Sequence, residues 1–527
     1  MATVALLILV FVAWPFASVF LEGLHNQGGK ESVSFFSMVR DARGLLEHSL
    51  VVALLTTGLT TFFALCLTFS FFFANKLIRQ IIHSLLTLGM ISPPFVASLA
   101  YLSLFGRRGL ITYRLFRLSW NPYGLKGIVL MQRFSFIPLA AMVLLAQLTN
   151  IDASLLDSAR SLGAKTWELI RDVLFPQLRG SLLVVLMLTM IRSLADFTTP
   201  TIIGGAYGVL STEAYLAFIA EGNLPKAMVL NLILLVPALL AMLVYLRAYR
   251  RVQTVTHGLA TPQTSGVLWG RGFAILASRL VAGAYLLALL LQYGTILLMA
   301  CGRWQGGVYG LTWANWADSV NHLGTSFLRS LAYSFVTAAA ATLIGFLLAY
   351  YLHIRQIRGF KLLDSLATLP YIIPGSFFGI AYILAFRSPP LALTGTAAIV
   401  LLNMTFKQVP LAAKLGASAL GNIDAGQIDS VQDLGGHPLL ALRDVLLPQS
   451  RSSLLLAFFR SFTSGMTTIG SIIFLVYPQR KLATLVLFDV VQSGKYGVAS
   501  VIAVLLTLVC WGMEYLGRKV GKVGKVS

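Results

Sequence analysis

Charged and hydroxyl side chains inside long apolar segments are the first residues in this sequence that could do chemistry. Arg192 and Asp196 are four residues apart in one such segment, and Arg460 lies in another. A charge at the centre of a membrane costs about 3 kcal/mol or more, so these residues are candidates for a path that carries a polar cargo. Arg192 and Asp196 could pair across one helical turn. The alternative for all of these residues is a structural pair or a side chain that reaches the membrane surface. The candidate path residues are Arg192, Asp196, Thr199, Arg460, Ser464 and Thr467.

Other kinds of chemistry find little support in the sequence. Cys66, Cys301 and Cys510 are far apart, which supports neither a disulfide framework nor a cysteine metal site. The seven histidines form no HxxxH or HExxH pattern. No nucleophile–base pair is evident. We therefore expect no catalytic residue, no metal site and no cofactor bound by this chain.

The composition defines the class of protein. Of 527 residues, 57% are hydrophobic and 11% are charged, whereas a soluble domain has about 25% charged residues. Lys and Arg number 40 against 19 for Asp and Glu, which gives a net charge of +21. These charges are sparse and separated by apolar runs, so the excess argues for basic membrane loops and against a nucleic-acid partner. A protein that crosses a membrane several times is what remains.

Twelve segments are long and apolar enough to cross a membrane. The sequence predicts an all-α polytopic membrane protein of about 12 transmembrane helices, arranged as two tandem six-helix halves at 1–252 and 271–527. Residues 253–270 are rich in Thr, Gly, Ser and Pro, which is typical of a linker. The predicted inner loops hold more Lys and Arg than the outer ones, which favours cytoplasmic N- and C-termini. The first segment lacks a basic flank, which is compatible with a start further upstream. The twelve segments are 3–21, 48–74, 83–105, 127–148, 181–203, 227–246, 273–299, 329–352, 362–386, 395–413, 452–476 and 497–516.

An internal repeat supports the two halves. Residues 157–177 match residues 429–449 at 10 of 21 positions without a gap, at an offset of 272. Six spans in each half give both copies one orientation, related by a pseudo-two-fold axis along the membrane normal. Arg460 precedes a serine as Arg192 does, so we expect these two arginines to correspond.

Each repeated segment predicts a helix–turn–helix along the inner membrane face. Asp157 and Asp429 suit a helix N-terminus, and Gly163 and Gly435 permit a sharp turn. A proline near the end of each segment is expected to stop the second helix. The alternative is a connecting loop without a special role, although such loops rarely repeat their spacing.

These segments resemble the EAA motif of ABC importer permeases. The family pattern is Glu-Ala-Ala, three residues, Gly, nine residues, Ile, one residue and Leu-Pro. Its spacing is kept in both copies, and the opening triplet departs from it, as Asp-Ser-Ala and Asp-Ser-Val. The resemblance implies that these residues couple the chain to an ATPase: Asp157, Ala159, Gly163, Pro176, Asp429, Gly435 and Pro448.

By this resemblance the chain is a fused permease of a type I ABC importer in a bacterial inner membrane. Its expected partners are two copies of a cytoplasmic ABC ATPase, an extracytoplasmic substrate-binding protein and membrane lipid. The chain is not expected to be an enzyme, because ATP is used by the partner subunit. None of the four Gly-Lys pairs is followed by Ser or Thr, so no Walker A loop is present in the sequence.

The substrate is the least defined part of this interpretation. Residues 194–200 and 464–470, together with the fused form, look like the ferric iron permeases of this family. Thiamine, phosphonate and sugar-phosphate permeases share that form. A twelve-span secondary transporter is a further alternative, although that class usually carries membrane carboxylates, and Asp196 alone is clearly placed in a span. Five basic residues in 106–126 form an outer loop that could meet an acidic face of the delivery protein.

Overall fold

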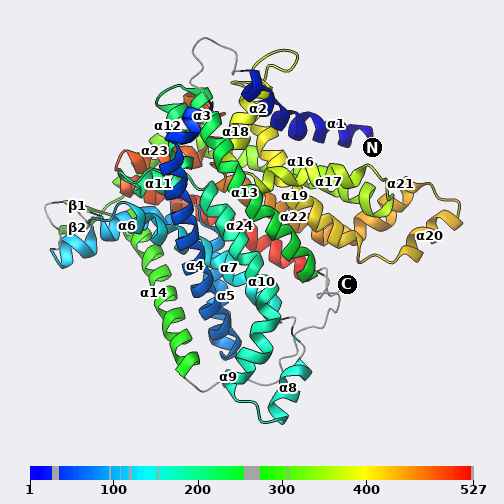
Figure 1. Cartoon of the computed structure of the whole chain (residues 1–527), viewed down its shortest axis with the longest axis horizontal. Helices are drawn as coiled ribbons and strands as arrows, with labels where there is room; N and C mark the ends of the chain where they lie inside the picture. Colours follow the sequence, from blue (N-terminus) through cyan, green and yellow to red (C-terminus); the bar gives the residue numbers. More distant parts are fainter. Residues whose placement is uncertain are drawn as a thin grey trace.

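The computed structural model is almost entirely helical (Figure 1). It describes residues 1–25, 35–93, 96–106, 109–117, 121–149, 151, 153–253, 273–305 and 308–523. Beyond Gln253, the predicted linker 253–270 lies outside the described residues. Within the described part, one antiparallel hairpin of β1 (Gly302–Gln305) and β2 (Val308–Leu311) interrupts the helices. The prediction of an all-α polytopic membrane protein is confirmed.

The elements of the predicted first half run from the N-terminus to Gln253. They are α1 (Ala2–Ile8), η1 (Leu9–Ala13), α2 (Trp14–His25), α3 (Phe35–Asp41), α4 (Arg43–Phe72), α5 (Lys76–Ile91), α6 (Val96–Phe105), η3 (Leu110–Leu115), α7 (Leu125–Thr149), α8 (Ala153–Ser161), α9 (Thr166–Glu168), η4 (Leu169–Leu174), α10 (Phe175–Ala195), α11 (Thr198–Ile203), α12 (Leu210–Ile219) and α13 (Leu224–Gln253).

The elements of the predicted second half follow the same order, with the hairpin added. The helices are α14 (Phe273–Cys301), α15 (Ala314–Leu323), α16 (Ser326–Ala349), η5 (Tyr350–Ile354), α17 (Phe360–Ile372), α18 (Gly375–Ala385), α19 (Ala397–Leu420), α20 (Ala425–Asp433), α21 (Pro438–Leu440), η6 (Ala441–Leu446), α22 (Leu447–Thr467), η7 (Pro478–Arg480), α23 (Ala483–Gln492) and α24 (Tyr496–Val523).

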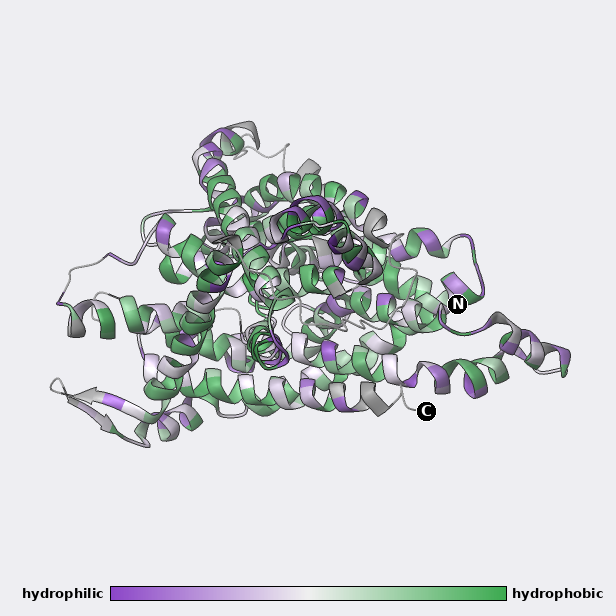
Figure 2. Ribbon diagram, turned by 90° about the horizontal axis from the view of Figure 1, so that it is seen from below, coloured by the Kyte–Doolittle hydropathy of each residue, from purple (hydrophilic) through white to green (hydrophobic). Residues whose placement is uncertain are grey.

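Ten of the twelve predicted spans coincide with apolar helices that could cross a membrane. Eight are single helices of sufficient length among the described residues, and two are pairs bent by 101° (α5 and α6) and 113° (α17 and α18). The other two predicted spans fall on α19 and α22, which are 24 and 21 residues long but more polar. Figure 2 shows hydrophobic residues along most of the helical surface, with hydrophilic residues gathered toward ends and connections.

The two repeats keep one sequence offset through four consecutive elements. Every element of the first repeat begins and ends 272 residues before its counterpart in the second: α8 and α20, α9 and α21, η4 and η6, and α10 and α22. At this offset Arg192 corresponds to Ser464. The predicted correspondence of Arg192 with Arg460 is therefore wrong, because Arg460 lies one helical turn earlier on α22.

A helix near the start of each predicted half packs against helices of the other predicted half. Helix α2 packs against α18, and α14 packs against α4 and α6. Small residues allow other helices to approach closely. A Cβ on Gly345 of α16 would lie 2.6 Å from the backbone nitrogen of Ala413 on α19, a contact that only a glycine permits. The two predicted halves therefore pack together through α2 and α14. The boundaries at 252 and 271 stay predictions.

Candidate functional site

The first repeat loop (residues 153–177) turns sharply at a glycine. Gly163 has φ +83°, a left-handed conformation that glycine adopts without steric cost. The amide of Gly163 donates to the Arg160 carbonyl at 2.8 Å, and the amide of Ala164 donates to the Ala159 carbonyl at 3.1 Å. This pair of bonds is a Schellman motif, which satisfies the free carbonyls at the end of α8. Ala159, the third residue of the EAA-like triplet, therefore helps to close the helix.

The second repeat loop (residues 425–449) makes the same turn. Gly435 has φ +76°, and the amide of Gly436 donates to the Val431 carbonyl at 2.8 Å. The space around both turn glycines is open, since a Cβ on Gly163 or Gly435 would meet nothing within 4 Å. The requirement for glycine at these positions is therefore set by backbone conformation and not by packing.

Two sequence predictions about these loops need correction. Asp157 and Asp429 lie in the middle of α8 and α20, with exposed side chains, and do not begin the helices. Pro176 and Pro448 do not stop the second helix, because residues 166–195 form one continuous helix and α22 likewise follows η6 without a break. The physical reason is the π-helical turn before each proline, which already interrupts the bonds that proline would break.

Exposed apolar side chains form the tip of each loop, and these residues were missed in the sequence. Leu162 is 88% exposed and Leu434 is 89% exposed. Trp167 and Leu439, which also correspond at the offset of 272, are exposed as well. The signal was present, since Leu162 and Leu434 are a matched pair directly before the repeated glycine. Apolar tips of this kind on otherwise polar loops are typical of a surface that binds a partner.

The two loops lie at separate extremities of the molecule. Figure 1 shows α8 and α9 at the lower end of one group of helices, and α20 and α21 at the right-hand end of another. The hairpin β1–β2 lies at the left, away from both loops. A partner that contacts both loops must therefore offer two separate binding surfaces.

Asp196 does not form the ion pair with Arg192 that the sequence allowed. Helix α10 ends at Ala195, and Asp196 lies just before α11, where its carboxylate accepts bonds from the first amides of that helix. Its Oδ1 accepts bonds from the amides of Thr198 and Thr199 at 3.0 and 3.1 Å. Its Oδ2 accepts a bond from Gln132 at 3.2 Å. Asp196 and Thr199 are thus brought together in a helix cap. This contact supports a structural role for Asp196, which was the alternative to a role in the transport path.

The remaining path candidates lie on α10 and α22, and each has contacts within its own predicted half. Arg192 is exposed and stacks its guanidinium over Phe136 at 4.9 Å. Arg460 forms an ion pair with Glu514 of α24 at 3.0 Å. Glu514, which is 4% exposed, is a second carboxylate in a predicted span that sequence reasoning missed. Thr467 donates within its own helix to Thr463, and Ser464 lies one turn before the end of α22.

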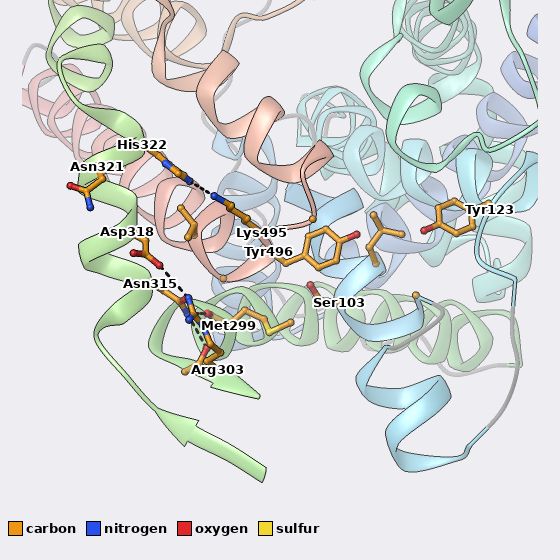
Figure 3. A pocket seen from close by; sticks show the side chains of 16 residues that line it. Ser103, Tyr123, Met299, Arg303, Asn315, Asp318, Asn321, His322, Lys495 and Tyr496 are labelled. Carbon is orange, nitrogen blue, oxygen red and sulfur yellow. Dashed lines mark hydrogen bonds and ion pairs between the residues drawn. The ribbon is translucent and has the colours of Figure 1, made fainter. Parts of the chain in front are cut away.

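A pocket of about 750 Å³ opens on the side away from the loops, near the hairpin (Figure 3). Arg303 donates to Asn315 and Asp318 at 3.2 Å, and Lys495 contacts His322 at the same distance. Ser103 and Tyr123 come from the first half, so the pocket joins both halves. No group of three or more His, Cys, Asp or Glu suited to a metal ion occurs within the described ranges.

The described part of the chain thus combines several apolar, membrane-spanning helices with two loops that share a glycine turn and an exposed leucine. Residues 60–254 match the family described as binding-protein-dependent transport system inner membrane component. This part of the chain is therefore similar to the membrane components of transport systems that depend on a binding protein.

Known permeases are similar over most of the chain. The ferric transport system permease protein FbpB of Actinobacillus pleuropneumoniae is 29% identical over 436 residues, covering 80% of this chain and 63% of that protein. A putative ferric transport system permease of Haemophilus influenzae is 29% identical over 74% of this chain and 63% of its own length. The thiamine transport system permease ThiP of the same organism is 31% identical over 35% of each chain. This chain thus spans 63% of the length of the two ferric relatives.

Proposed function

We propose that this chain forms the membrane path of an ABC importer and is coupled through its two repeat loops to separate ATPase subunits. The observation that carries the proposal is the pair of loops with one backbone geometry and matched apolar tips at Leu162 and Leu434. Two loops with the same turn and a matching exposed leucine fit two copies of one ATPase, since each copy would meet the same turn and a leucine at its tip. The chain itself supplies no catalysis, and ATP is hydrolysed by the partner.

The separation of the two loops supports an alternating-access mechanism. In Figure 1 the loops lie far apart, as expected when the halves are open on the side of the loops and the ATPases are not closed on ATP. Closure of the ATPases on ATP moves the loops together and opens the opposite side. In this scheme the loops and both termini are cytoplasmic, and the pocket near the hairpin faces the extracytoplasmic binding protein.

The proposed cargo is ferric iron, because the two relatives that cover most of this chain are ferric permeases by name. Thiamine is the second candidate, since ThiP is 31% identical over a shorter stretch. A phosphonate or sugar phosphate remains an alternative from the family resemblance. A secondary transporter is disfavoured because it needs no ATPase-docking loops, whereas both loops are built alike here.

Transport in vesicles tests the proposal. The chain is co-expressed with an ABC ATPase and a binding protein from neighbouring genes, and uptake of radioactive ferric iron and of thiamine is measured with and without ATP. We expect ATP-dependent ferric uptake that is lost when the ATPase is omitted. Uptake driven by an ion gradient without the ATPase would overturn the proposal, and ATP-dependent uptake of thiamine alone would change the cargo.

A further inference from the structure

Lys407 of α19 lies against the start of α18, in the seam between the halves. A Cβ on Gly375, the first residue of α18, would lie 3.1 Å from the Lys407 ammonium. Lys407 has no carboxylate within 4.0 Å and no hydrogen-bond acceptor among the residues the structure describes. Lys414, two turns further along α19, also forms no ion pair within 4.0 Å in the described part of the chain, but its ammonium lies over the rings of Tyr249 and Tyr371, at 5.5 and 5.8 Å from their centres.

This position is electrostatically unfavourable for a lone cation. The N-terminus of a helix carries partial positive charge and attracts anions. Helix α18 is 11 residues long and follows a 113° bend after α17, so its first amides have no preceding helical turn to bond. A lysine at this end repels the helix dipole unless a negative group lies between them.

Two buried polar residues on the segments around Lys407 have side chains without hydrogen-bond partners. A Cβ on Gly375 would lie 3.1 Å from the backbone nitrogen of Ser471, and the Ser471 hydroxyl is fully buried without a hydrogen bond. Asn403 lies one turn before Lys407 on α19, fully buried, and neither its amide nitrogen nor its amide oxygen has a partner. Buried polar groups are normally hydrogen-bonded, so these groups indicate a ligand.

We propose that Lys407, the amides at the start of α18 and Ser471 form an oxyanion site on the transport path. The ligand class is an anionic oxygen group, either a free oxyanion or one bound to a metal ion. Such a ligand would place its negative charge between the ammonium and the helix N-terminus and accept a bond from Ser471. That this anion belongs to the cargo rests on the proposed function, whereas the site itself does not.

The first half does not repeat this site. At the offset of 272 the residue that corresponds to Lys407 is Ser135, and the one that corresponds to Asn403 is Met131. The charge therefore occurs once per chain, as expected for a path along the pseudo-two-fold axis that holds one anion at a time. The Ser376 hydroxyl at the start of α18 donates to Asn231 of α13 at 2.7 Å, which joins the site to the first half.

Thermal unfolding of the purified full chain in detergent tests the site without any ATPase or binding protein. Sulfate, inorganic phosphate and chloride are compared at equal ionic strength, and ferric citrate is compared with citrate alone. We expect an oxyanion at millimolar concentration to raise the unfolding midpoint by about 2 °C or more over chloride. A further rise with ferric citrate over citrate would identify a metal-bound oxyanion as the preferred ligand.

Matched variants assign the effect to Lys407. Lys407→Met should remove the oxyanion-dependent rise, whereas Lys414→Met should keep it, because Lys414 lies two turns along α19 from Lys407. If Lys407→Met fails to insert, Lys407→Arg should keep the rise and Ser471→Ala should weaken oxyanion affinity several-fold. An equal rise in wild type and Lys407→Met, or no rise in wild type, overturns the site. If either of those results is found and ATP-dependent transport is intact, the oxyanion site is wrong but the proposed function still holds.

Discussion

The two repeat loops share a backbone but build it from different side chains. In the first loop, Ala159 closes the helix and Ala164 follows the turn glycine. In the second loop the corresponding residues are Val431 and Gly436. A Cβ on Gly436 would lie 2.6 Å from both Cγ1 and the carbonyl oxygen of Val431. In the second loop a larger residue, Val431, replaces alanine, and a smaller residue, Gly436, replaces the alanine beside it. This compensation indicates that both loops preserve the shape of the turn.

The largest expected effect is loss of the turn itself. Gly163→Val and Gly435→Val each force a β-branched residue into a left-handed conformation, at about 1–2 kcal/mol, which reduces the native turn about 5- to 30-fold. We expect ATP-dependent transport to fall by a similar factor while membrane insertion stays normal. Asparagine tolerates this conformation, so Gly163→Asn and Gly435→Asn are the matched controls and should keep most activity. Full transport in both valine variants would contradict the role of the turn.

The next effect concerns the exposed tips. Burying a leucine contributes about 1.5–3 kcal/mol, so Leu162→Ser and Leu434→Ser should each weaken the affinity for the ATPase about tenfold or more. If the loops bind two copies of one ATPase, the two variants should have equal effects. The measurement is co-purification and surface-plasmon-resonance affinity of the ATPase. Leu311→Ser in β2, where the leucine is 81% exposed at a distance from the loops, serves as the control. Unchanged affinity in both loop variants would remove the tips from the interface.

A smaller effect tests the exchange between Val431 and Gly436. Gly436→Ala should strain the second turn and lower transport several-fold, because its Cβ meets Val431. Val431→Ala in the same chain should restore part of the transport, since it removes the Cγ1 contact and recreates the alanine pair of the first loop, whereas the contact with the carbonyl oxygen stays. The reciprocal change, Ala159→Val, should be harmful alone and tolerated with Ala164→Gly. Gly436→Ala without any loss of transport would show that the pairing is incidental.

The sequence predicted the sharp turn in each loop because its signals are local and repeated. A repeated glycine and a fixed spacing need no knowledge of distant contacts. Asp157 and Pro176 were misread because helix boundaries depend on bonds beyond one motif: α8 begins four residues before Asp157, and a π-helical turn accommodates Pro176. A one-turn error of register also linked Arg192 to Arg460.

The path residues were less predictable because charges in spans depend on their partners. Asp196 reads as half of an ion pair in sequence, yet it caps α11 once α10 ends before it. Arg460 is balanced by Glu514, 54 residues away on another helix. Lys407 forms no ion pair within 4.0 Å among the described residues. It was not selected as a path residue, because its neighbours Gly375 and Ser471 are distant in sequence.

The smallest expected effect lies where the two loops begin their second helix. In the first loop the Lys165 amide donates to the Glu168 carboxylate at 2.7 Å. In the second loop the Leu439 amide donates to His437 Nδ1 at 3.3 Å, and Pro438 holds the first turn in helical conformation. Glu168→Gln should therefore cost about 0.5–1 kcal/mol of local stability, and His437→Ala should cost less, because the proline remains.

Transferring the proline sharpens this last difference. Lys165 is extended, with φ −72° and ψ 161°, which is the conformation that a following proline requires. Thr166→Pro should therefore fit the first loop and restore the stability that Glu168→Gln removes, by limiting the freedom of the unfolded loop. Hydrogen exchange of the amides at 167–170 measures the change, with the second loop of the same chain as internal control. Slower exchange in the double variant than in Glu168→Gln is expected, because the two loops reach one helix start by interchangeable means. Equal exchange rates in the double variant and in Glu168→Gln would show that a fixed backbone angle at residue 166 cannot replace the stabilising effect of the Glu168 carboxylate.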